Sequence, residues 1–282
     1  MELLRTPEAM REWADARRSE GARIGLVPTM GYLHEGHVSL VRIAKERGCG
    51  AVAATIFVNP TQFGPGEDYE KYPRDEARDL AMLSAAGTRA VYLPGVKDMY
   101  PDGHQTHVEV TGVSKGLCGA ARPGHFRGVA TVVAKLFLAA KPHVAVFGEK
   151  DCQQLAVIRA MTRDLDFGIE IVGAPIVREE DGLAMSSRNA YLKGDDRVAA
   201  RCLSRGLNRA KALFDGGERD AGVLVAAARE EIVREPLAKL DYAEGRAPET
   251  LSPVSGRVDA ITILVAAKVG PARLIDNITI RK

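Results

Sequence analysis

The sequence predicts an α/β protein: a doubly wound, Rossmann-like parallel sheet followed by a smaller C-terminal α+β domain. Over the first two-thirds of the chain, short apolar runs alternate with segments of helical period. Buried strands that alternate with helices are typical of a parallel sheet covered on both faces. That rhythm stops near Val177, where Gly and Pro become frequent. We therefore predict one domain over residues 1–176 and a second over 177–282, with a hinge near residues 174–182.

The apolar runs and helical segments define the expected elements. The expected strands are "RIGLVPT" near Ile24, "AVAATIFV" from Ala51 to Val58, "RAVYLP", "HVAVFG" and "IEIVGAPIV". The expected helices between them are "HVSLVRIAKERG", "RDEARDLAMLSAAG", "GVATVVAKLFLAAK" and "DCQQLAVIRAMTRDL". The second domain is expected to hold two helical segments, about 196–214 and 219–234, and the strand-like runs "KLDYAEG" and "AITILVAAKV". In such folds ligands bind at the carboxyl ends of the parallel strands.

Composition excludes several classes of function. The 282 residues are 46% hydrophobic and carry a formal net charge of +2, which gives no electrostatic footprint for nucleic acid. No stretch approaches a membrane span, and the charged N-terminus lacks the apolar region of a secretory signal. The cysteines are far apart and form no C-x-x-C pair, which favours reduced thiols over a metal site: Cys49, Cys118, Cys152 and Cys202. We expect a cytoplasmic protein.

The stretch "PTMGYLHEGHVSL", residues 28–40, follows the first strand and opens a helix. His34 and His37 are three residues apart, so they share one face of that helix. The N-terminus of a helix attracts anions, and imidazole N–H groups placed there could hold phosphate oxygens. The plainer alternative is that one histidine caps the helix and the other is half-buried. A zinc site is a weaker interpretation, because no H-E-x-x-H type of ligand spacing is present.

Three further segments place polar groups at strand ends or at the hinge. Asn59 and Gln62 follow the second strand, where amides suit a small polar substrate or simply form an Asn-Pro turn. Lys150, with Asp151 and Gln154 close behind it, begins the helix after "HVAVFG"; it is placed for phosphate, or it forms a solvated turn. The "SSR" at 186–188 reads as a phosphate-gripping loop or as an ordinary helix cap.

These segments together resemble the H-x-G-H superfamily of nucleotidylyl transferases, with "HEGH" and "MSSR" in the places of its two signatures. The more specific resemblance is to the pantothenate synthetase (pantoate–β-alanine ligase) family. The segments that carry it are "PTMGYLHEGHVSL", "TIFVNPTQFGPGEDYEKYPR", "FGEKDCQQL" and "REEDGLAMSSRNAYL". The resemblance spans nearly the whole chain, with its weight in residues 24–192. In the C-terminal part, Gly245 stands where the family usually has an apolar residue.

The resemblance implies a reaction and a set of site residues. ATP and (R)-pantoate form pantoyl adenylate and pyrophosphate, and β-alanine then displaces AMP to give pantothenate. His34, His37, Lys150 and Arg188 are the expected catalytic residues. The ATP site is expected to comprise Met30, Gly31, Tyr32, Leu33, His34, Glu35, Gly36, His37, Gly148, Glu149, Lys150, Asp151, Val177, Met185, Ser186, Ser187 and Arg188. Pantoate and β-alanine are expected at Gln62, Gln154, Asn59, Met30 and Phe57.

The resemblance also implies Mg²⁺ on the ATP phosphates, with Asp79 as its protein partner, and a homodimer in which residues 177–282 act as a lid. The carboxylate of β-alanine is left to Arg122, His125 or Arg127, for which a solvated basic loop is the alternative. Two rival functions stay open: another nucleotidylyl transferase with a phosphorylated acceptor, and a non-catalytic ATP-binding sensor. Pyrophosphate release that depends on pantoate separates all three.

Overall fold

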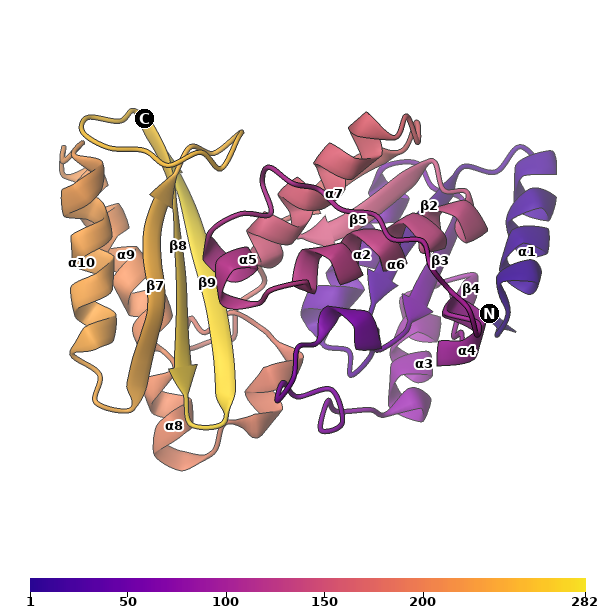
Figure 1. Cartoon of the computed structure of the whole chain (residues 1–282), viewed down its shortest axis with the longest axis horizontal. Coiled ribbons are helices and arrows are strands. Elements are labelled where there is room, and N and C mark those ends of the chain that lie inside the picture. The colour runs from indigo at the N-terminus through magenta and orange to yellow at the C-terminus, as the bar shows by residue number, and fades with distance from the viewer. The chain divides into compact units, whose positions relative to one another are not determined.

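A six-stranded parallel sheet organises the first part of the chain and a three-stranded antiparallel sheet the second (Figure 1). The computed structural model describes residues 1–282, which fall into two compact units. The first unit comprises Met1–Glu149 and Val157–Pro175, and the second comprises Lys150–Ala156 and Ile176–Lys282. The second unit therefore takes in a short segment at the start of a helix as well as the C-terminal part.

In the first unit the strand order is β1-β4-β3-β2-β5-β6, and every neighbouring pair is parallel. The strands are β1 (Glu2–Leu4), β2 (Ile24–Thr29), β3 (Ala51–Ile56), β4 (Ala90–Tyr92), β5 (Val144–Gly148) and β6 (Glu170–Ala174). The helices are α1 (Pro7–Ser19), α2 (Glu35–Glu46), α3 (Glu76–Ala85), α4 (Val96–Met99), α5 (Leu117–Ala121), α6 (His125–Ala140) and α7 (Cys152–Asp164), with 3-10 turns η1 (Pro60–Gln62) and η2 (Glu149–Asp151). Of these, the part of η2 and α7 that spans Lys150–Ala156 belongs to the second unit. This arrangement confirms the predicted fold class.

Both faces of this sheet are buried, as its apolar strands require. Val27 packs with α2 and α3 on one face, while its neighbour Leu26, which points to the other face, is equally inaccessible to solvent. On that second face the ring of Phe137 on α6 lies 6.4 Å from that of Phe147 on β5. Because both faces are covered, the polar positions of the sheet are confined to the strand ends.

Two elements at the N-terminus were not expected from the sequence. Strand β1 is only three residues long and adds an edge beside β4, so it carries too little periodicity to be recognised. Helix α1 has clearer signals, since Thr6 caps it by accepting a bond from the Ala9 N–H at 3.2 Å, and Pro7 occupies its first turn.

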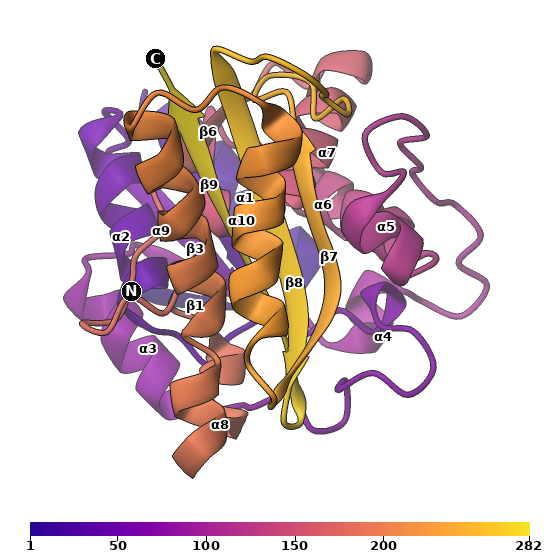
Figure 2. The ribbon, with the colours of Figure 1, turned by 90° about the vertical axis from the view of Figure 1, so that its left-hand side faces the viewer.

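The second unit is an antiparallel sheet of order β7-β8-β9 with α9 and α10 on one face (Figure 2). Its elements are η3 (Ser187–Tyr191), α8 (Gly194–Ala199), α9 (Cys202–Asp215), α10 (Ala221–Val233), β7 (Ala238–Arg246), β8 (Ala260–Val269) and β9 (Ala272–Arg281). The strand β9 was not among the expected elements. Ala272, Leu274, Ile278 and Ile280 stand at even spacing along β9, but the adjacent pairs Leu274–Ile275 and Asp276–Asn277 break the strict alternation that predicts a strand.

Two general features complete the fold. None of the helices combines the length and the apolar character that a membrane crossing needs. All four cysteines are free, and burial raises the pKa of Cys202 to about 12, so this thiol stays protonated.

Candidate active site

The H-x-x-H segment forms a tight loop between β2 and α2. Gly31 and Tyr32 both adopt positive φ angles, +85° and +50°. Gly31 suits this turn because a Cβ there would lie 3.0 Å from both Asp79 and Ile56. The loop therefore turns sharply after the strand end and places His34 just before α2 and His37 in its first turn.

The two histidines lie together, with ring centroids 4.1 Å apart. His34 precedes α2, and its backbone N–H donates to Nδ1 of His37 at 3.3 Å. A backbone N–H can only donate, so Nδ1 of His37 accepts and the proton of the neutral ring stands on Nε2. His37 thus carries its N–H donor on Nε2, at the positive end of a 12-residue helix.

Asp79 of α3 holds this loop from beneath. Its two carboxylate oxygens accept the backbone N–H groups of Tyr32 at 2.6 Å and Leu33 at 2.7 Å, and the residue is only 1% exposed. Burial raises the pKa of Asp79, although both loop N–H groups and Arg78 favour its ionised form. Both oxygens are thus engaged by the main chain, which is an anchoring role that the sequence did not reveal. The metal contact predicted for Asp79 stays a prediction.

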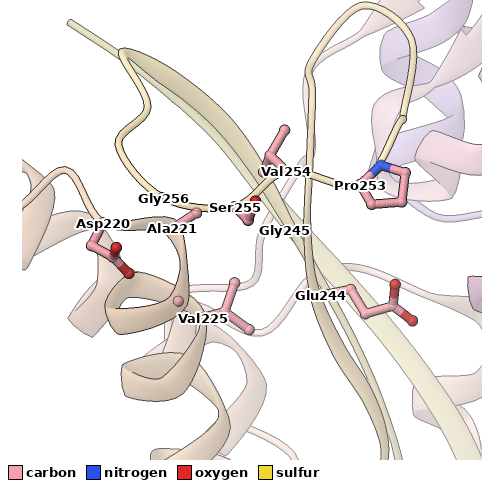
Figure 3. Close-up of a pocket in the computed structure, with 10 residues that line it drawn as sticks. Asp220, Ala221, Val225, Glu244, Gly245, Pro253, Val254, Ser255 and Gly256 are labelled. Atoms are coloured by element: carbon pink, nitrogen blue, oxygen red, sulfur yellow. The ribbon is translucent and has the colours of Figure 1, made fainter.

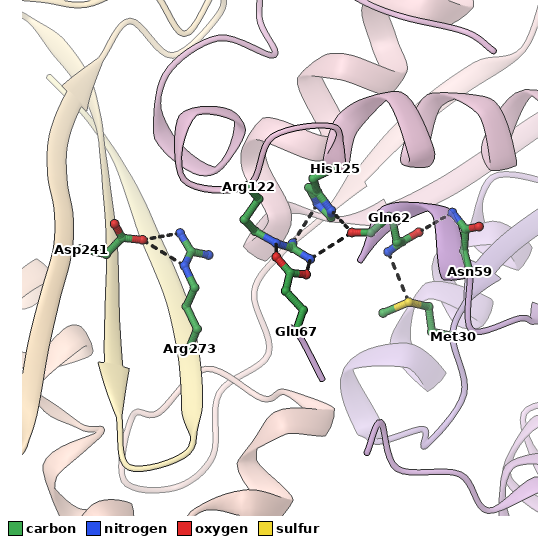
Figure 4. Close-up of polar contacts among 8 residues, drawn as sticks. All are labelled: Met30, Asn59, Gln62, Glu67, Arg122, His125, Asp241 and Arg273. Carbon is green, nitrogen blue, oxygen red and sulfur yellow. Dashed lines mark hydrogen bonds and ion pairs between the residues drawn. The ribbon is translucent and has the colours of Figure 1, made fainter. Parts of the chain in front are cut away.

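A second polar group follows β3 (Figure 4). Asn59 begins η1 and is 1% exposed; its Nδ2 donates to Oε1 of Gln62 at 3.0 Å. The Nε2 of Gln62 in turn donates to the sulfur of Met30 at 3.3 Å. Three of the residues predicted to bind pantoate therefore lie in one connected group, and the internal bonds of Asn59 also support the turn-building alternative.

The main chain of Gln62 is fixed by residues from the loop before α6 (Figure 4). Arg122 donates to the Gln62 carbonyl at 3.2 Å and to Nε2 of His125 at 3.0 Å. Since a guanidinium only donates, Nε2 of His125 accepts, and its Nδ1–H donates to the same carbonyl at 2.8 Å. Gly128 allows this close approach, because a Cβ there would lie 2.3 Å from the carbonyl oxygen of Thr61.

Arg122 also holds the loop that follows Gln62. Its Nε and Nη2 bond both oxygens of Glu67, at 2.8 and 2.5 Å (Figure 4). Burial works to raise the pKa of Glu67, but the hydrogen bonds and charge of Arg122 outweigh it and keep that pKa below its ordinary value. Of the three candidates for the β-alanine carboxylate, Arg122 and His125 are thus engaged within the protein, while Arg127 is exposed.

The remaining predicted residues belong to the second unit or to its border. Gly148 ends β5, and a Cβ there would meet no atom within 4 Å. Lys150 lies in η2, where its carbonyl accepts from Nδ2 of Asn277 on β9 at 2.9 Å. Its main chain is therefore tied to the small sheet, and Gln154 follows one turn later on α7.

The loop that carries "MSSR" is built on the same sheet. The N–H of Met185 donates to the carbonyl of Val177 at 3.0 Å, which closes the segment between them into a hairpin. Arg178 within it forms a bidentate pair with the buried Asp276, at 2.7 and 2.9 Å. Ser186 then caps η3 by accepting from the Arg188 N–H at 3.2 Å, so its hydroxyl has the capping role weighed as the alternative.

Two cavities differ in the chemistry that they offer. One of about 310 Å³ lies in the first unit and is lined by Met30, Gly31, Phe57 and Asp79, among others. The other, of about 340 Å³, lies in the second unit beside Gly245 (Figure 3). The only titratable side chains that line it are Asp220 and Glu244, so it does not suit an anionic substrate.

Comparison with known proteins agrees with this arrangement. Residues 2–279 match the family described as Pantoate-beta-alanine ligase. A pantothenate synthetase of Anaeromyxobacter dehalogenans is 56% identical over 282 residues, which cover 98% of this chain and 97% of that protein. The crystal structure of pantothenate synthetase from Thermus thermophilus superposes with a TM-score of 0.94 at 46% identity, covering both chains completely.

A third relative was solved with ligands. It is the Francisella tularensis pantoate-beta-alanine ligase, complexed with "Beta-gamma ATP" and β-alanine, with a TM-score of 0.80, 32% identity, and coverage of 99% of this chain and 97% of that one. The family match extends over nearly the whole chain. It includes the segments that carry the histidine pair and the group formed by Asn59, Gln62 and Met30. The chain therefore belongs to the pantoate–β-alanine ligase family.

Proposed function

We propose that this chain condenses (R)-pantoate with β-alanine at the expense of ATP, giving pantothenate, AMP and pyrophosphate through pantoyl adenylate. Membership of the family supports the reaction, and the complex of the Francisella relative supports ATP and β-alanine as substrates. The observation that carries the proposal is the loop before α2, where the tautomer of His37 puts the N–H donor of the ring on Nε2, at a helix N-terminus. Such a donor stabilises charge that develops on a phosphate.

In the first step, a carboxylate oxygen of pantoate forms a bond to the α-phosphorus of ATP. The bond between that phosphorus and the oxygen that bridges the α- and β-phosphates breaks. Negative charge grows on the α-phosphate oxygens and on the leaving pyrophosphate. We assign His34 and His37 to the former, Lys150 to both, and Ser186, Ser187 and Arg188 to the latter. No residue need act as a nucleophile, because positioning and electrostatic stabilisation carry the step.

In the second step, the free amine of β-alanine attacks the acyl carbon of pantoyl adenylate. The bond from that carbon to the bridging oxygen breaks, AMP leaves with the oxygen, and the new amide nitrogen releases one proton. We assign the β-alanine carboxylate to Arg127, whose side chain is exposed, since Arg122 and His125 already hold Gln62. Gln62 and Gln154 are assigned to the oxygens of pantoate, and Met30 and Phe57 to its methyl groups.

Mg²⁺ is proposed as the partner of the ATP phosphates, whose charge it would neutralise. No group of three His, Cys, Asp or Glu side chains could hold a metal alone, which fits an ion bound mainly by the nucleotide. The homodimer, the lid role of residues 177–282 and the cytoplasmic location stay predictions.

The test is pyrophosphate release from ATP by the purified full-length chain, with and without pantoate, followed by mass-spectrometric detection of pantothenate after β-alanine is added. We expect release only with pantoate. The His37→Ala variant, purified from the same host, is the control for contaminating host enzymes, because pyrophosphate release by such an enzyme would persist in it. ATP binding without pyrophosphate release would indicate a sensor, and release only with a phosphorylated acceptor would indicate another nucleotidylyl transferase.

A further inference from the structure

We propose that Asn59 and Tyr100 are positioning residues that fix the amide of Gln62 in one orientation, so that Gln62 offers the substrate an N–H donor and no acceptor. Gln62 then recognises an oxygen of pantoate through its lone pair, whether that oxygen belongs to the carboxylate or to a hydroxyl. This inference rests on the proposed function, because it specifies how the same site reads its acid substrate.

The orientation of Asn59 is set by groups whose direction cannot reverse. The backbone N–H of Thr61, which can only donate, lies 3.3 Å from Oδ1 of Asn59. The carbonyl of Gly128, which can only accept, lies 3.2 Å from its Nδ2. A flipped Asn59 amide would set N–H against N–H at Thr61 and oxygen against oxygen at Gly128, and Asn59 itself is only 1% exposed.

Tyr100 adds a donor from a distant part of the chain. Its hydroxyl donates to Oδ1 of Asn59 at 2.8 Å, and the hydroxyl of Thr61 donates to the same oxygen at 2.9 Å. Burial raises the pKa of Tyr100, so the phenol keeps the proton that it donates. Oδ1 thus has three donors and Nδ2 two acceptors, the second being Gln62.

The orientation of Asn59 determines that of Gln62. Nδ2 of Asn59 donates to the side-chain oxygen of Gln62 at 3.0 Å, which turns that oxygen towards the protein (Figure 4). Nε2 of Gln62 carries two N–H groups and donates to the sulfur of Met30 at 3.3 Å, which is a weak acceptor. Met30 lines the cavity of about 310 Å³ in the first unit, so a donor stands beside the residue that borders this space.

The direct test is nuclear magnetic resonance of the full-length, ¹⁵N-labelled protein titrated with pantoate alone. The Gln62→Met spectrum identifies the side-chain NH₂ signals of Gln62. We expect one Gln62 proton to move downfield at saturation while the Asn59 NH₂ signals stay in place. An unmoved Gln62 pair, or a shift of Asn59 in its stead, would overturn the proposal, because Gln62 would then accept from the substrate or not touch it.

The role of Tyr100 is tested by kinetics of Tyr100→Phe, which removes only the hydroxyl. We expect the KM for pantoate to rise by about three- to tenfold, which is the effect of losing one neutral hydrogen bond. The KM for ATP and kcat should stay nearly unchanged. The matched control is Tyr92→Phe, since Tyr92 is a buried tyrosine of the same unit whose hydroxyl donates to the sulfur of Met99 at 3.6 Å.

Equal effects of the two tyrosine variants, or parallel rises in both KM values, would show that Tyr100 serves only the general fold. Failure of the wild-type chain to form pantothenate would instead refute the proposed function. That outcome is distinct from a wild-type enzyme that works but shows no selective loss in Tyr100→Phe.

Discussion

His37 is held in one tautomer by the main chain of its own loop. The N–H of His34 donates to its Nδ1 at 3.3 Å, which puts the ring proton on Nε2. The same logic applies to His125, where Arg122 fixes the acceptor nitrogen and the other nitrogen donates to Gln62. In both rings a neighbour that can only donate decides what the imidazole can do.

Replacing His37 by alanine removes one donor aimed at developing charge. We expect His37→Ala to lower pyrophosphate formation by roughly 100- to 1000-fold with little change in Tm, the usual scale for one such donor. His107→Ala is the control, because His107 is an exposed histidine of the same unit. Near-normal turnover by a folded His37→Ala protein would remove His37 from the mechanism.

Two carboxylates, one on a helix and one in a loop, hold the loops of the first unit. Asp79 on α3 anchors the loop before α2, and Glu67 ties the segment after η1 to Arg122 before α6. The loops that follow β2 and β3 are thus fixed by side chains far away in sequence. These contacts hold the polar groups of the loops at the carboxyl ends of the two strands.

Asp79→Asn replaces one acceptor oxygen by an NH₂ group that faces a backbone N–H. We expect a loss of about 1–3 kcal/mol in the free energy of unfolding and a raised KM for ATP. If Asp79 only anchors the loop, the concentration of Mg²⁺ that gives half-maximal activity should stay the same. A variant of normal stability that needs tenfold more Mg²⁺ would instead make Asp79 a metal partner.

Glu67→Gln tests the ion pair with Arg122 through its dependence on pH. The pKa of Glu67 in the folded protein lies below its ordinary value of 4.5, so its stabilising effect is complete above that pH and is lost as pH falls through the lower, folded pKa. We expect wild type to exceed the variant by about 1–2 kcal/mol in unfolding free energy at pH 7. Urea titrations should show this gap closing below pH 4.5, and a gap that did not depend on pH would contradict the ionic role.

Each unit of the molecule supplies its own part of the proposed chemistry. The first unit carries the histidine pair and the Gln62 group, and the second carries Lys150 and the hairpin that leads to Arg188. Arg178 and Asp276 hold that hairpin against β9 through two hydrogen bonds, so the small sheet fixes the start of the segment 186–188 that is assigned to pyrophosphate.

Removing the two cations should separate the half-reactions. We expect Arg188→Ala to slow adenylation strongly and leave the second step nearly untouched, because pyrophosphate has departed by then. Lys150→Ala should slow both steps if Lys150 also holds the α-phosphate. Rapid-quench kinetics would start once from ATP with pantoate and once from supplied pantoyl adenylate with β-alanine. If Arg188→Ala slowed the two reactions equally, this residue would not act specifically on pyrophosphate.

The strand ends and their motifs could be predicted from the sequence, because buried strands are continuous apolar runs and polar residues follow them directly. The supports of those motifs could not. Tyr100 reaches Asn59 from 41 residues away, and Arg122 reaches Glu67 from 55. Neither pairing leaves a local pattern. Asn59 is another case, since the segment "NPTQ" does not reveal that the amide of Asn59 is fully hydrogen-bonded to other protein groups.

The path of a single oxygen atom tests the two-step reaction most directly. Pantoate labelled with ¹⁸O in its carboxylate is converted with ATP and β-alanine, and the products are weighed by mass spectrometry. If the carboxylate attacks the α-phosphorus and the amine then breaks the acyl–oxygen bond, each AMP should carry one ¹⁸O and pyrophosphate none. Unlabelled AMP, or label in inorganic phosphate formed with ADP, would contradict a pantoyl-adenylate intermediate.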